Sequence, residues 1–177
     1  VRELAYNWQT NDYASIDLSI MAPHLFNGHT VVDMAYARAP VPALWAVRSD
    51  GALLGMTYVP EQQVYGWHHH VTAGFFESAA VVSEGLEDAL YVLVRRTVNG
   101  RSVRYTERMG STTFTAQEDA FYVDSGLTYD GAPVTTLSGL HHLEGEAVQV
   151  LADGAEVTGR VVTGGQITDG ATFTLDD

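Results

Sequence analysis

Short runs of β-branched and aromatic residues, interrupted by Asp-Gly and Asn-Gly pairs, dominate the pattern of hydrophobic and polar positions. Two-residue hairpin turns need positive φ at their central residues, which Asn, Asp and Gly adopt most easily. The pattern therefore predicts three antiparallel hairpins. Their turns are Asp50-Gly51, Asn99-Gly100 and Asp153-Gly154, flanked by runs at 44–48 and 53–58, 90–96 and 103–109, and 148–151 and 156–157.

Three further segments, 30–36, 63–68 and 75–82, have the same strand-like composition, and the first follows an Asn27-Gly28 turn. Helical signals are scarce. The best is 15–26, where Ser15 is a candidate N-cap. Pro23 makes a long helix unfavourable there. The sequence thus predicts an all-β fold with one short helical turn.

The first two predicted turns recur at a spacing typical of propeller blades. Asp50 and Asn99 lie about 49 residues apart (from 50 to 99), and each turn is flanked by further strands. Four antiparallel strands every 40 to 50 residues are the signature of a blade. We expect residues 1–125 to form about two such blades, with two unrelated hairpins in an open sheet as the alternative.

Beyond Tyr122 the strands become short and glycine-punctuated turns become frequent. Dense turns of this kind are typical of a small β-barrel or sandwich, which we expect over residues 126–177. The turns are predicted at Ser138-Gly139, Glu144-Gly145, Asp153-Gly154, Gly164-Gly165 and Asp169-Gly170.

The balance of acidic and basic residues is the most unusual feature of the composition. The formal net charge is −13, and all nine basic residues are Arg. Such a surface disfavours phosphate binding and hence ordinary nucleic-acid binding. The absence of Cys excludes disulfides and thiolate chemistry, and no apolar run approaches the roughly 20 residues that span a bilayer. A start at Val1, with no leader pattern after it, is expected for a piece of a longer chain.

The run His68-His69-His70 is the strongest candidate for metal chemistry. In a strand, His68 and His70 share one face and His69 points to the other. Such a pair holds a divalent metal if a third ligand arrives, from His141-His142 or Glu77. An exposed run at a strand end is the simpler interpretation, so the sequence predicts no metal site, no cofactor and no catalytic residue.

Acidic clusters in polar loops are the remaining candidates for catalysis. Glu84, Glu87 and Asp88 form one, and Glu118 and Asp119 form another. Glycoside hydrolysis needs two carboxyl groups across a cleft, one with a raised pKa, whereas solvated surface charge explains both clusters. Since phosphate-cradling and nucleophile-elbow motifs are also absent, we expect that the protein is not an enzyme.

Arginines and aromatic residues are expected to be structural. Arg104 and Arg108 share a face of their predicted strand, and we expect them to pair with acidic residues of a neighbouring blade or subunit. Core and inter-strand packing is the simplest role of the aromatic residues, with a sugar-binding platform as the alternative. These are Trp45, Tyr58, Tyr65, Trp67, Phe75, Phe76 and Tyr91.

The order of these segments resembles the tail nozzle proteins of bacteriophages, also called tail tubular protein B. The resemblance covers most of the chain and contains no catalytic motif. It is carried by residues 43–51, 53–58, 64–68, 74–78, 95–100, 105–109, 127–131 and 140–154.

The resemblance implies a structural virion protein, assembled in the bacterial host cytoplasm into a ring, usually of six copies, with other tail proteins as partners. The ring forms the end of the tube through which DNA leaves, so that an acidic wall would let DNA pass without adhering. Family members are longer, which implies an internal fragment. A carbohydrate-binding adhesin-type module of a virion or cell surface is the alternative, and a propeller-like glycosidase is a third class.

Overall fold

The computed structural model is all-β and antiparallel, as the sequence predicted. It describes residues 1–116, 120, 122–152 and 154–173. The strands are β1 (Arg2–Asn7), β2 (Asp12–Asp17), β3 (Val31–Ala37), β4 (Ala43–Arg48), β5 (Leu53–Val59), β6 (Val64–His70), β7 (Phe75–Glu84), β8 (Glu87–Val98), β9 (Arg101–Arg108), β10 (Val134–Ser138), β11 (Ala147–Ala152), β12 (Ala155–Val161) and β13 (Gln166–Phe173).

The chain divides into two compact units. The first contains residues 1–95 and 104–120, and the second contains residues 96–103 and 121–177. The tip of the β8–β9 hairpin therefore belongs to the second unit. The domain boundary predicted near residue 125 lies close to the point where the chain passes from one unit to the other.

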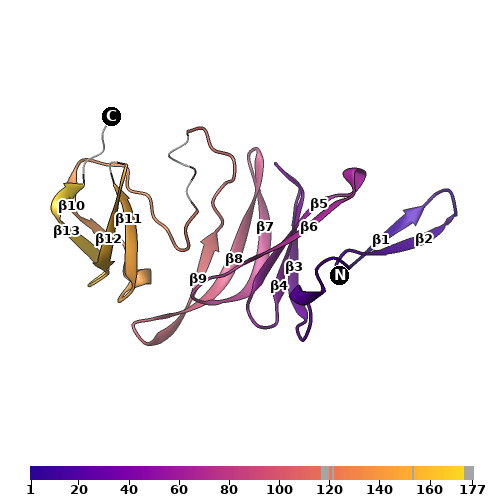
Figure 1. Cartoon of the computed structure of the whole chain (residues 1–177), viewed down its shortest axis with the longest axis horizontal. Coiled ribbons are helices and arrows are strands. Elements are labelled where there is room, and N and C mark those ends of the chain that lie inside the picture. The colour runs from indigo at the N-terminus through magenta and orange to yellow at the C-terminus, as the bar shows by residue number, and fades with distance from the viewer. Residues whose placement is uncertain (117–119, 121, 153, 174–177) are drawn as a thin grey trace. The chain divides into compact units, whose positions relative to one another are not determined.

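A four-stranded meander, in the order β3-β4-β5-β6, forms the main sheet of the first unit (Figure 1). The hairpin predicted at Asp50-Gly51 joins β4 to β5, but only Gly51 has positive φ, at 84°. The expected two-residue turn is wrong, because the N–H of Arg48 still donates to the carbonyl of Ala52 at 2.9 Å. This bond leaves a three-residue loop, Ser49 to Gly51, which needs positive φ only at its last residue. The predicted strands 30–36 and 63–68 correspond to β3 and β6.

The second sheet of this unit has the order β7-β8-β9. Its predicted hairpin turn is confirmed, since Asn99 and Gly100 have φ of 49° and 71° between the ends of β8 and β9. The two sheets share one hydrophobic core, whose fully buried members include Val47, Leu53 and Val94. Strands β3 and β7 lie side by side at one border of that core.

A short N-terminal segment covers the other face of the four-stranded sheet. Ala22 and Leu25 pack there against the buried Ala46 and Leu54. Of the short helical turn expected near 15–26, a single 3-10 turn at Pro23–Leu25 is present. Ser15 caps no helix, because Asp12–Asp17 form strand β2.

The hairpin β1–β2 is a feature that the sequence analysis missed. Its strands pair from Arg2↔Asp17 to Asn7↔Asp12 and extend as a two-stranded ribbon (Figure 1). Every residue of β2 is exposed. Two-stranded hairpins are marginally stable in water, so this ribbon depends on other contacts.

The second unit contains two small antiparallel ladders, β10–β13 and β11–β12. A core of Leu140, Val162 and Ile167 lies beneath them. Among the described residues these ladders do not close into a barrel. Of the barrel and the sandwich expected for residues 126–177, the barrel is therefore wrong.

Two predicted turns of this unit have different outcomes. The turn expected at Asp169-Gly170 is wrong, because both residues lie within β13, where the pairing with β10 shifts its register. Asp153 lies outside the described residues, while Gly154 has a φ of 72° at the start of the return to β12. The propeller-like arrangement of the first unit stays a prediction.

Candidate functional site

The run His68-His69-His70 lies in β6, at the edge of the four-stranded sheet. As the strand alternation predicted, His68 and His70 share a face. Their ring nitrogens approach closely, with 3.0 Å between His68 Nδ1 and His70 Nε2. Both rings border Trp45, with ring centroids 5.7 Å and 5.4 Å from the indole. The pair is therefore a defined contact, not two independent surface side chains.

Gly55 makes the position of the His68 ring possible. Gly55 is the partner of His68 in the register between β5 and β6. A Cβ atom on Gly55 would lie 2.2 Å from Cε1 of His68. The imidazole thus lies directly over the backbone of the neighbouring strand, a placement that needs glycine at this position.

The environment of the pair favours neutral imidazoles. Burial lowers the pKa of His68, and the charge of His69 adds to this. Burial also lowers the pKa of His70, followed by the charges of His68 and His69. Removing an imidazolium from water and placing it beside another both disfavour the charged form.

The sequence named two sources of a third metal ligand, and only Glu77 belongs to the same unit as His68 and His70. Glu77 is bound by two arginines, Arg104 at 2.6 Å and Arg95 at 3.0 Å. The His141-His142 pair belongs to the second unit. Within the described residues no group of three or more His, Asp or Glu is placed to hold a metal ion.

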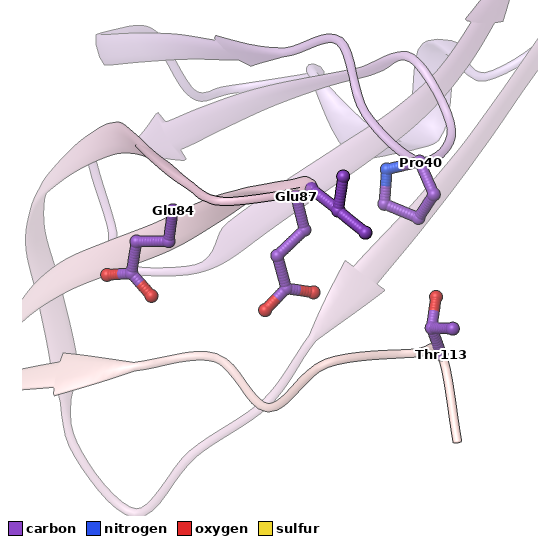
Figure 2. A pocket seen from close by; sticks show the side chains of 5 residues that line it. Pro40, Glu84, Glu87 and Thr113 are labelled. Atoms are coloured by element: carbon purple, nitrogen blue, oxygen red, sulfur yellow. The ribbon is translucent and has the colours of Figure 1, made fainter. Parts of the chain in front are cut away.

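The first acidic cluster borders a shallow pocket of the first unit. Its lining comprises Pro40, Glu84, Leu86, Glu87 and Thr113. Figure 2 shows the carboxylates of Glu84 and Glu87 pointing to the same side of the chain. One guanidinium, that of Arg108, binds both, at 2.9 Å and 2.6 Å.

Hydrogen bonding keeps these carboxylates ionised. Donation from Tyr91 and then from Arg108 lowers the pKa of Glu84. Donation from Ser111 and then from Arg108 lowers the pKa of Glu87. A general acid needs a raised pKa, so this pair is arranged as a salt-bridge network.

The remaining acidic candidates add no site. The carboxylate of Asp88 accepts hydrogen bonds from Ser83 and from the backbone of Arg38, and these lower its pKa. Glu118 and Asp119 lie outside the described residues.

The arginines pair within their own sheet. Arg104 on β9 binds Glu77 on β7, and Arg108 binds Glu84 and Glu87 on β7 and β8. The partners expected from a neighbouring blade or subunit are therefore not needed to neutralise these two side chains.

Most aromatic residues predicted to pack do pack. Trp45 and Phe76 are buried in the core between the sheets. Tyr36, Tyr58 and Tyr65 form a ladder on the opposite face, with ring centroids 6.2 Å and 5.9 Å apart. Burial and a hydrogen bond with Glu3 raise the pKa of Tyr58 to about 12.

An aromatic cluster on the β1–β2 hairpin was missed. Tyr6 contacts Trp8 and Tyr13, with ring centroids 4.8 Å and 5.3 Å away. Trp8 is 86% exposed and Tyr13 65% exposed. The alternation of Leu4, Tyr6 and Trp8 was the available signal, because apolar residues two apart share a strand face.

Comparison with known proteins adds no family assignment to this geometry. No protein-family model matches the chain, and no curated protein matches it. No helix of the described residues is long and apolar enough to cross a bilayer. The resemblance to bacteriophage tail nozzle proteins therefore depends only on the sequence segments between residues 43 and 154 that carry it, and it stays a prediction.

Proposed function

We propose that this chain is a structural component of a bacteriophage tail, of the nozzle or tubular type, and forms part of the wall of the DNA-exit conduit. The observation that carries the proposal is the amount of apolar surface left on its strands. Contiguous exposed apolar side chains mark surfaces that other proteins cover.

Two such surfaces belong to the first unit. On β3, Met34 and Tyr36 share one face, Val32 lies at the register shift just before them, and each of the three is 44% exposed or more. On the β1–β2 hairpin, Leu4 is 69% exposed, and Trp8 and Tyr13 of the aromatic cluster are 86% and 65% exposed. We call these the β3 face and the hairpin face. Copies of the same chain in a ring, usually of six, and other tail proteins are the proposed partners.

The charge distribution supports a role as a wall. The net charge is −13, and ion pairs engage several of the few cations, including Arg48 with Asp50 at 2.7 Å. An excess of carboxylates remains, which offers DNA no counterion-release gain. DNA would therefore move along a wall of this charge without binding to it. The proposed location is accordingly the virion tail, after assembly in the host cytoplasm.

Self-association tests the proposal directly. We expect the chain to form oligomers in sedimentation velocity, and Trp8→Ser and Met34→Ser each to weaken association at least about tenfold. Val71→Ser is the matched control, because Val71 is 80% exposed but belongs to neither face. A chain that stays monomeric, or a control that weakens association equally, contradicts the proposal.

The hairpin face also supports the second candidate function, a carbohydrate-binding adhesin-type module. Exposed aromatic rings such as those of Trp8 and Tyr13 stack on the apolar faces of sugars. Binding on a glycan array that Trp8→Ala abolishes, from a chain that does not oligomerise, would favour this candidate over the tail component.

A further inference from the structure

The contact between His68 and His70 has a geometry that a shared metal ion would also use. Two imidazole nitrogens that ligate one ion at about 2.0–2.1 Å are separated by about 2.9 Å when they occupy cis positions at a right angle. A tetrahedral angle would separate them by about 3.3 Å. The observed separation between His68 Nδ1 and His70 Nε2 is 3.0 Å.

We propose that His68 and His70 chelate one divalent late first-row metal ion, Cu²⁺ or Ni²⁺, through His68 Nδ1 and His70 Nε2. Cu²⁺ and Ni²⁺ fit this pair because both bind imidazole and adopt tetragonal coordination, in which two cis imidazoles and several waters share one ion. In the free pair one of the two facing nitrogens carries the proton of their hydrogen bond. When the ion binds, that proton moves through solvent to the outward nitrogen of the same ring, so that both neutral imidazoles are then protonated on the outward side, at His68 Nε2 and His70 Nδ1. Binding thus exchanges one internal hydrogen bond for two metal–nitrogen bonds, with no net proton release.

The surroundings hold both rings in place. The His68 ring lies over Gly55, and Trp45 borders both rings. Preorganised ligands lose little freedom on binding, which raises affinity. Strand β6 is an edge strand of its sheet, and the His68 side chain is partly exposed, so an ion can reach the pair from solvent.

Only these two side chains are assigned as ligands. Since the described residues contain no group of three candidate ligands, water completes the coordination sphere. Such a site binds and releases its ion readily, and a donor atom from another chain could replace one of the waters.

His69 provides an internal control for the experiment. It lies between the two ligands in sequence, but strand alternation places it on the opposite face of the sheet. We expect calorimetric titration of the full chain with Cu²⁺ or Ni²⁺ to give one site. His68→Ala and His70→Ala should each lower the affinity at least about tenfold, and His69→Ala should not change it.

The two tryptophans on opposite faces of the sheet locate the ion. Bound Cu²⁺ should broaden the indole N–H signal of Trp45, next to the pair, before that of Trp67, whose indole donates to Leu18 on the other face. Failure of the wild type to bind, equal losses in all three histidine variants, or broadening of Trp67 first would overturn the proposal.

Gly55→Ala tests the geometry without removing a ligand. The added methyl group would displace the His68 ring, and we expect a loss of affinity comparable to that of His68→Ala. Gly66→Ala is the matched control, since a Cβ at Gly66 on β6 meets nothing within 4 Å. Thermal unfolding establishes that both variants fold, and wild-type affinity in Gly55→Ala would contradict the proposed placement.

Discussion

A few single residues determine how the two sheets of the first unit meet. The carboxylate of Asp33 on β3 accepts hydrogen bonds from Ser78 Oγ at 2.7 Å and from the backbone N–H of Ala79 at 3.0 Å. These bonds join strands that belong to different sheets. One acidic side chain thus replaces part of the backbone ladder that β3 and β7 lack.

The Asp33 carboxylate predicts a specific pH dependence. Hydrogen bonds from Ser78 and Ala79 lower its pKa, so its contribution is present above the unfolded pKa of about 3.9 and is lost as the pH falls through the folded pKa. We expect Asp33→Ala to cost about 1 to 2 kcal/mol at pH 7, because two donors lose their acceptor.

Urea unfolding of the wild type and Asp33→Asn at pH 7 and pH 3 measures this effect. The amide keeps one acceptor but does not titrate, so the difference between the two proteins should shrink at pH 3. An equal difference at both values would show that the carboxylate charge is not involved.

Gly51 is a second residue with a defined role. Its φ is 84°, and a Cβ there would lie 2.4 Å from the ring of Phe75. We expect Gly51→Ala to destabilise the fold by about 2 kcal/mol or more, from backbone strain plus displacement of the ring. Gly85→Ala, at a φ of 63° in open space, should cost only the strain, about 1 kcal/mol. Similar urea midpoints for the two variants would contradict this role.

At the scale of elements, local chemistry explains what could be predicted from the sequence. The turn at Asn99-Gly100 was predictable because both residues adopt positive φ in a two-residue turn. The β1–β2 hairpin was not, because its turn contains no glycine and Asn11 alone takes positive φ, at 54°. The turn predicted at Asp169-Gly170 is wrong because a register shift lets strand β13 continue through these two residues.

The candidate site was predictable only in part, for a related reason. Alternation along β6 placed His68 and His70 on one face. Their separation depends on Gly55, which the register between β5 and β6 sets opposite His68. Such cross-strand pairing is a tertiary property, and the sequence spacing of the two histidines does not contain it.

The hairpin β1–β2 gives a prediction at this scale. With every residue of β2 exposed, the isolated ribbon opens easily in a single chain. We expect its amide hydrogens to exchange at least about a hundredfold faster than those of β5, where Leu53, Leu54 and Met56 are fully buried. Assembly should slow exchange in the hairpin, and equal rates before and after assembly would exclude it from the interface.

At the scale of the whole molecule, apolar strand surfaces and a net charge of −13 act in opposite directions on assembly. The apolar faces favour association, while like charges repel at distances within a Debye length of about 10 Å at 0.1 M salt. Association should therefore strengthen as NaCl is raised, with sedimentation at several salt concentrations as the measurement. Association that weakens with salt would indicate attraction between opposite charges instead.

Sedimentation velocity of the chain at raised salt, followed by negative-stain electron microscopy of the largest species, shows whether the chain assembles into a ring. We expect discrete oligomers that appear as closed rings, and we expect Trp8→Ser and Met34→Ser each to dissociate them. A monomer at every concentration, particularly one that binds a glycan through Trp8, would contradict it.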